Sequence, residues 1–104
     1  MSTKQEKIVS YIHFAIKSGK ITLGLDQIER LKKAPKLIIK DNNLAENSNK
    51  KLQKYAEEKN VKIVLDKTNA ISEIYKEKNV KVIAISDENL ANALIKTYEE
   101  LEEC

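Results

Sequence analysis

The chain has 104 residues, of which 41% are hydrophobic and 34% are charged, with a formal net charge of +3. This length and composition predict a single folded domain over residues 1–104 and exclude a disordered chain. Cys104 is the only cysteine, so an intrachain disulfide is excluded, and the start after Met1 is too polar for a signal peptide. No apolar run approaches the roughly 20 residues of a membrane span. We therefore expect a cytoplasmic protein with no membrane partner.

Charge is distributed unevenly along the chain. Residues 1–40 carry nine Lys/Arg against three Asp/Glu, whereas residues 82–104 carry one against six. A basic half of this kind is typical of proteins with a polyanionic partner, and a solvated surface without a partner is the alternative.

The first predicted elements are a helix, a strand and a second helix. Apolar spacing predicts a helix over 5–18 with Ile8, Ile12 and Ala15/Ile16 inward, which Gly19 ends in the left-handed conformation. The segment "KITL" (20–23) is predicted as a strand that ends at Gly24. The spacing of Leu25, Ile28 and Leu31 predicts a helix over 25–33, and Pro35 bars its continuation.

The remainder of the chain repeats the alternation of strands and helices. Apolar runs predict strands over 36–40, 61–65 and 80–85, and helices are predicted over 48–59, over 70–76 and after Asp87 as cap. The expected inward residues of these helices are Leu52, Tyr55, Ala56, Ile71, Ile74, Tyr75, Leu90, Leu94, Tyr98 and Leu101. Asn47 or Ser48 is expected to cap the first of them. This order predicts a three-layer α/β/α sandwich with a mixed four-stranded sheet.

Two short passages are nearly identical, "EKNVKIV" (58–64) and "EKNVKVI" (77–83). Each is predicted as a helix end followed by a buried strand, with Asn60 and Asn79 in the left-handed conformation between them.

Residues suited to catalysis or metal binding are scarce. His13 is the only histidine, and a nucleophilic relay would have to combine it with Ser10 or Ser18. The glycines match no phosphate-binding or dinucleotide-binding fingerprint. We therefore expect no enzymatic activity, no metal and no cofactor.

The stretch around Gly24 is the candidate binding site. A glycine that turns a strand into a helix leaves unpaired amides at the helix start, which suit a phosphate. Lys20 precedes this turn, and Gln27, Arg30 and Lys33 follow at helical spacing. These residues predict an anion-binding surface, and a plain turn with a solvated basic face is the alternative.

Several short motifs, taken in order, resemble the kink-turn-binding ribosomal protein family, most closely its small bacterial YlxQ-like branch. They are Ser18-Gly19-Lys20 with Gly24, the stretch "KLIIKDNNLAENSNKKL" (36–52), Asn60-Val61, and Ile85-Ser86-Asp87 with Ala91. The resemblance covers nearly the whole chain. It implies an α/β/α sandwich that binds structured RNA, kink-turn-like, ribosomal or regulatory, with the ribosome as a candidate partner. We also expect a monomer.

The resemblance also implies the site residues. By position, the family's RNA-reading motif is Gly24-Leu25-Asp26-Gln27, with Arg30 as the cation that holds phosphates. A second loop, over 66–71, would cover a flipped-out base. Its candidate residues are Thr68, Asn69, Ala70 and Ile71, the last two as apolar cover. Asp26 stands where the family has Asn or Lys, and this departure motivates the alternative of a protein-interaction module on the same fold.

Overall fold

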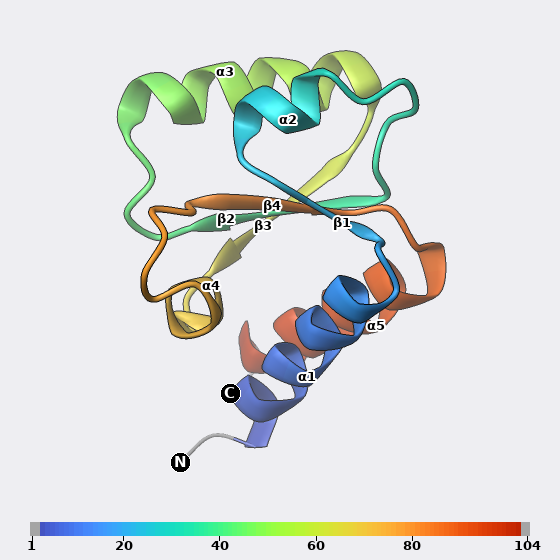
Figure 1. Cartoon of the computed structure of the whole chain (residues 1–104), viewed down its shortest axis with the longest axis vertical. Helices are drawn as coiled ribbons and strands as arrows, with labels where there is room; N and C mark the ends of the chain where they lie inside the picture. Colours follow the sequence, from blue (N-terminus) through green and yellow to red (C-terminus); the bar gives the residue numbers. More distant parts are fainter. Residues whose placement is uncertain (1–2, 103–104) are drawn as a thin grey trace.

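Helices and strands alternate along the chain and build three layers (Figure 1). The structure, a computed structural model, describes residues 3–102, with side chains over 5–101, so the predictions for Cys104 lie outside the described residues. The elements are α1 (Thr3–Lys17), β1 (Ile21–Leu23), α2 (Leu25–Glu29), β2 (Leu37–Asp41), α3 (Glu46–Lys59), β3 (Lys62–Asp66), α4 (Ala70–Ile74), β4 (Val82–Ile85) and α5 (Glu88–Glu102). Helices α2 and α3 cover one face of the sheet, and α1, α4 and α5 cover the other (Figure 1). The predicted α/β/α sandwich is confirmed.

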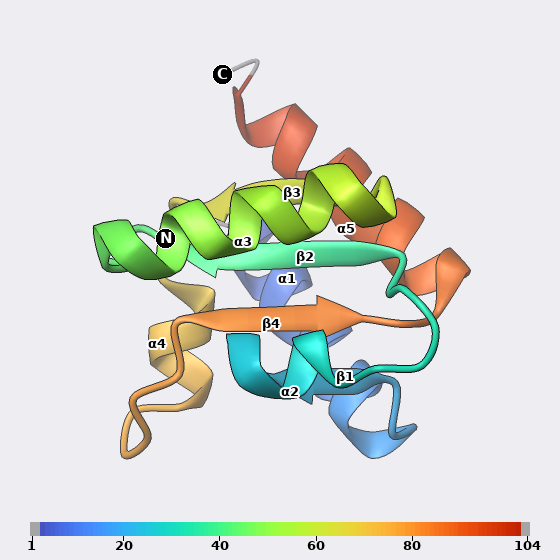
Figure 2. The same ribbon diagram turned by 90° about the horizontal axis from the view of Figure 1, so that it is seen from above.

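The four strands form one mixed sheet in the order β1-β4-β2-β3. Strands β2 and β3 are parallel, with Asp41 opposite Asp66 at their ends, and β4 is antiparallel to both β1 and β2. Because β4 runs against the other strands, its start lies beside their ends (Figure 2). We call this side of the sheet the carboxyl edge. It carries the connections into α2, α3 and α4 and the connection from α4 to β4.

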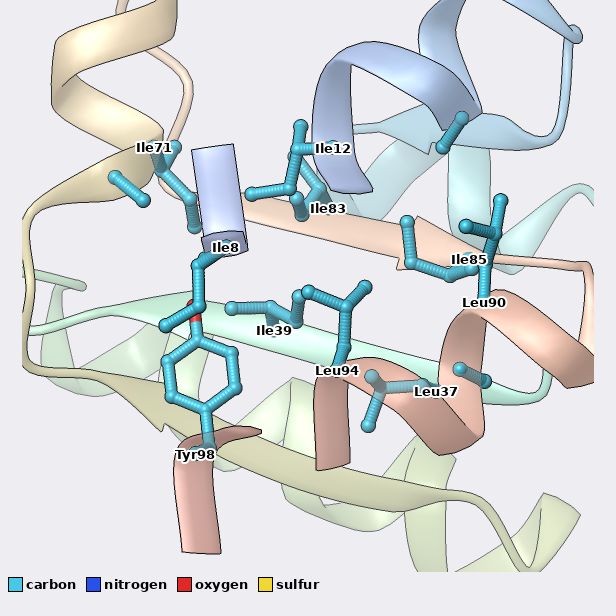
Figure 3. Packing of buried hydrophobic residues seen from close by; sticks show 13 residues of the cluster. Ile8, Ile12, Leu37, Ile39, Ile71, Ile83, Ile85, Leu90, Leu94 and Tyr98 are labelled. Carbon is cyan, nitrogen blue, oxygen red and sulfur yellow. The ribbon is translucent and has the colours of Figure 1, made fainter. Parts of the chain in front are cut away.

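The larger core lies between the sheet and α1, α4 and α5 (Figure 3). Alternate residues of a strand point to opposite faces, so every second residue of β2 and β4 enters this core. Its fully buried members include Ile8, Ile12, Leu37, Ile39, Ile71, Ile83, Ile85 and Leu94. The helical stripes predicted for α1 and α5 are confirmed by these contacts, except that Ile16 is 37% exposed because Ala15 takes the inward position.

A smaller core on the opposite face holds α2 and α3 against the sheet. The residues of β2 and β4 that point to this face, Ile38, Val82 and Ala84, enter it. The predicted inward face of α3 packs against them. Its buried members are Ile28, Ile38, Leu52, Tyr55, Val82 and Ala84. Because both faces of β2 and β4 are covered by helices, β4 is apolar throughout and β2 is apolar over its first three residues, as expected for the centre of a sandwich.

The second helix is shorter than predicted. It ends at Glu29 instead of residue 33, and the backbone closes with the tight turns Arg30 N–H to Gln27 C=O and Leu31 N–H to Ile28 C=O. Only Ile28 of this helix is fully buried, so further turns would add no fully buried side chain to stabilise the helix. Pro35 disfavours helical backbone at the residue before it, and the chain must extend toward β2. The prediction of a helix over 25–33 was therefore wrong in its second half.

Two predicted backbone details are also wrong. Helix α3 begins at Glu46 with Ala45 as its cap residue, without a side-chain cap from Asn47 or Ser48. The turn after β2 closes early, through Leu44 N–H to Asp41 C=O, so the chain is already helical two residues before the predicted start. Among the described residues other than glycine, positive φ occurs at Asn60, as predicted, and at Asn69, but not at Asn79. Helix α4 ends at Ile74, so Asn79 follows a turn instead of a helix.

Candidate nucleic-acid interface

Gly24 turns the end of β1 into α2 with a backbone conformation that other residues avoid. Its φ is 83° and its ψ is 147°, a region that is essentially restricted to glycine. Its N–H donates to Val82 C=O at 2.9 Å, and its carbonyl accepts from Ile28 N–H at 3.1 Å. A Cβ built at Gly24 would meet nothing within 4 Å. Glycine is therefore required here by the backbone conformation and not by a lack of space for a side chain.

A cleft of about 510 Å³ opens at the carboxyl edge beside this turn. It is bounded by the start of α2, the start of α3 and the residues that lead into β4. Its lining residues are Leu23, Gly24, Leu25, Asp26, Gln27, Leu44, Ala45, Ser48, Lys51, Asn79, Lys81 and Val82. We call it the α2–α3 cleft. Its lining contains two cations, Lys51 and Lys81, against one carboxylate, Asp26.

The helix start best suited to an anion in this cleft belongs to α3. Helix α2 has only five residues, and a helix dipole needs several aligned peptides to build up. Helix α3 has 14 residues, and no side chain caps its first turn. Ala45 and Ser48 of this turn line the cleft, and Lys51 follows one turn later. The first turn of α3 is therefore a second candidate anion site, beside the one predicted at the second helix.

A buried carboxylate, Asp41, lies at the end of β2, where it contacts Ser72 of α4. Asp41 accepts from Asn43 N–H at 2.9 Å through Oδ2, and the same oxygen is 3.7 Å from Lys81 Nζ. Its other oxygen accepts from Ser72 Oγ at 3.4 Å. The carboxylate thus joins three segments at the carboxyl edge.

A second buried carboxylate, at the end of β3, folds the loop before α4. Asp66 Oδ1 accepts from Thr68 N–H at 3.1 Å, from Thr68 Oγ1 at 2.6 Å and from Tyr98 Oη at 3.2 Å, and Oδ2 accepts from Ile71 N–H at 3.0 Å. Burial, and then the Asp66 charge and hydrogen bond, raise the pKa of Tyr98 well above its ordinary value. The loop is therefore held by internal hydrogen bonds.

The structure separates the predicted site residues into two groups. Gly24, Leu25, Asp26 and Gln27 lie together in the cleft. Three predicted cations do not line it. Lys20 lies at the start of β1, beside Ser86, near the opposite edge of the sheet, whereas Arg30 and Lys33 follow the last turn of α2.

The loop after β3 also differs from the expectation. Ala70 and Ile71 are fully buried in the larger core, so their side chains are not available to cover a base in this structure. The hydroxyl of Thr68 is bonded to Asp66, and Asn69 is exposed. The segment that does border the cleft is the one after α4, with Asn79 and Lys81.

Sequence reasoning missed Lys51, Lys81 and the two buried carboxylates. A signal for the carboxylates was present, because the predicted strands "KLIIK" and "VKIVL" are each followed by an aspartate. Lys51 stands in the stretch 36–52 that carries the family resemblance but was not predicted as a site residue, and no local signal marks Lys81 among the 18 lysines of the chain.

Among the described residues, no group of three His, Cys, Asp or Glu side chains could hold a metal ion. His13 is exposed on α1. Over the same described residues, no helix has the length and apolar character needed to cross a bilayer.

The fold is shared with solved structures of low sequence identity. No protein-family model and no curated protein matches the chain. A protein of unknown function from Bacillus halodurans aligns with a TM-score of 0.75 at 14% identity, over 89% of this chain and 97% of that chain. The Giardia lamblia 15.5 kD RNA-binding protein aligns with a TM-score of 0.64 at 19% identity, over 99% of this chain and 91% of that chain. These alignments establish a common fold over nearly the whole length of each chain.

Proposed function

We propose that this chain is a non-catalytic protein that binds structured RNA through the α2–α3 cleft. The observation that carries the proposal is the composition of the cleft. It combines a glycine turn, the uncapped first turn of a 14-residue helix and two lysines in a hollow of about 510 Å³. Phosphate groups are bound in proteins by such combinations of helix amides and cations.

Each part of the cleft has a distinct role in this proposal. Lys51 and Lys81 neutralise phosphates, for which a lysine is a point charge without base selectivity. Gln27 carries both a donor and an acceptor and reads a base edge. Gly24 and Leu25 present backbone close to the RNA. Arg30 and Lys33, beyond α2, extend the basic surface outside the cleft.

The class of RNA follows from the family resemblance together with the fold. The Giardia lamblia protein of the same fold is an RNA-binding protein, and the motif Gly24–Gln27 matches the family's RNA-reading segment by position. In its most specific form, the proposal names kink-turn or ribosomal RNA as the ligand and the ribosome as the partner. It also includes a cytoplasmic location and a monomeric protein.

The test is binding of the full chain to a panel of kink-turn and ribosomal RNA fragments at several salt concentrations. Neutralisation of Z phosphates predicts a slope of log K against log salt of about −0.7Z to −0.9Z. The double variant Lys51→Gln/Lys81→Gln should weaken binding and flatten the slope. Lys7→Gln/Lys96→Gln is the matched control, because Lys7 and Lys96 are exposed on α1 and α5, which cover the other face of the sheet. Absence of salt-sensitive binding below ~100 μM would exclude RNA as the ligand.

A protein-interaction module is the second candidate, favoured by the exposed carboxylate of Asp26 in the cleft. An ionised carboxylate only accepts hydrogen bonds and repels phosphate. A partner captured from cells that stays bound after nuclease treatment, with no RNA binding in the panel, would select this candidate.

A further inference from the structure

Asp41 is one of two buried carboxylates at the carboxyl edge, and the one that contacts a lysine. Its side chain is fully buried, although the end of a strand requires no charge there. Removing an ionised carboxylate from water is costly unless charged or hydrogen-bonding partners compensate. Its partners come from three separate segments: Asn43 before α3, Ser72 in α4 and Lys81 before β4.

The backbone reinforces the contact between Asp41 and Lys81. Asp41 N–H donates to Lys81 C=O at 2.7 Å, while Asp41 Oδ2 lies 3.7 Å from Lys81 Nζ. The side chain of Lys81 remains 35% exposed, and Lys81 is one of the residues that border the cleft. An ammonium group has three donors, so one can face Asp41 while the others stay available to a ligand at the border of the cleft. Among the described residues, Asp66, the register partner of Asp41, contacts no lysine ammonium, and its hydrogen bonds go to Thr68, Ile71 and Tyr98.

We propose that Asp41 is a positioning residue that holds Lys81 at the border of the α2–α3 cleft, where Lys81 contacts an RNA phosphate. This inference rests on the proposed function. A free lysine loses rotamer freedom when it binds, and a lysine already held by a buried carboxylate loses less. The same carboxylate, through Asn43 N–H, also anchors the connection that leads to the uncapped start of α3.

The direction in which one substitution changes RNA affinity distinguishes this positioning role from simple charge repulsion. Asp41→Asn removes a negative charge near the cleft, so repulsion alone would make RNA binding tighter. Loss of positioning predicts weaker binding, by about 2- to 10-fold, the effect of one lysine that must be immobilised on binding. Asp87→Asn is the matched control. It removes one carboxylate at the opposite edge of the sheet, where Asp87 caps α5 through Asn89 N–H at 2.8 Å. Its RNA affinity should stay within about twofold of wild type, because asparagine is an equally good cap.

A double-mutant cycle distinguishes positioning from a general loss of structure. In the Lys81→Gln background, Asp41→Asn should have no further effect on RNA affinity, because the residue through which it acts is absent. A merely structural role would weaken binding by the same factor in both backgrounds. The folded fraction of every variant is measured by thermal melting at the assay temperature.

The wild-type protein provides a second readout should Asp41→Asn fail to fold. In the free chain, the side-chain ammonium of Lys81 should be more restricted by NMR relaxation than that of Lys96. Equal mobility of the two ammonium groups would overturn the inference, and so would unchanged or tighter binding by folded Asp41→Asn.

If wild type binds no RNA of the panel, the proposed function fails and the inference with it. Wild-type binding with no Asp41 effect removes the inference alone.

Discussion

Replacing Gly24 by alanine tests whether the start of the site depends on one backbone conformation. Gly24 has φ 83° and ψ 147°, and residues held in this region cost of order 1–3 kcal/mol unless they are glycine. A Cβ at this position meets nothing within 4 Å, so no packing clash adds to this cost. We therefore expect Gly24→Ala to lower the free energy of unfolding by about 1–3 kcal/mol. For a domain of this size, each kcal/mol lowers Tm by about 4–8 °C.

Gly19 provides the comparison within the same chain. Its φ is 69°, and it ends α1 with Gly19 N–H to Ile16 C=O at 3.2 Å and Lys20 N–H to Ala15 C=O at 2.9 Å. This is the left-handed helix end that asparagine also adopts. Gly19→Asn should therefore cost less than Gly24→Asn, although neither new side chain meets a steric obstacle at its Cβ.

The assay is urea unfolding followed by far-ultraviolet circular dichroism, with m-values compared to check that the variants unfold alike. Gly24→Ala within about 0.5 kcal/mol of wild type would refute the reasoning, because the strain at this turn would then be negligible. Equal costs for the two asparagine variants would show that their backbone conformations are equivalent.

Two further predictions follow from the buried tyrosine and the cleft carboxylate. The pKa of Tyr98 is raised above its ordinary value of 10.0 in the folded chain, so the folded state holds this proton more tightly than the unfolded state. The stabilisation that comes from the protonated Tyr98 is complete below pH 10 and is lost as the pH rises above 10 toward the raised pKa. The free energy of unfolding of wild type, relative to that of Tyr98→Phe, should therefore fall between pH 9 and pH 11 in urea titrations. A difference that stays constant over this range would contradict the prediction. Asp26→Asn removes a charge that repels phosphate from the cleft and adds a hydrogen-bond donor. Kink-turn RNA should therefore bind more tightly to the variant than to wild type, as measured by fluorescence anisotropy. Weaker binding would show that the carboxylate itself contacts the RNA.

Local patterns were sufficient to predict the elements that bury a regular stripe. The inward face of α3, with Leu52, Tyr55 and Ala56, and that of α5, with Leu90 and Leu94, are buried as predicted. A stripe of this kind is a property of a few consecutive turns, and it requires no knowledge of the partner surface.

Local chemistry also predicted two element ends. Gly19 has positive φ, and Asp87 caps α5 through Asn89 N–H and Leu90 N–H. Caps form between residues that are neighbours in the sequence, so their signal is local.

The composition of the cleft, in contrast, was decided by the tertiary structure. Gly24 and Lys81 are far apart in the sequence, and they meet because β4 inserts between β1 and β2 and runs against both. The same strand order brings Lys81 to Asp41, whereas the length of α2 was set by the single anchor Ile28 and the path toward β2. Strand order depends on contacts between distant segments, and no local periodicity records those contacts. The sequence by itself therefore determined the elements and the layers, and the packing of the sheet determined which side chains share the cleft.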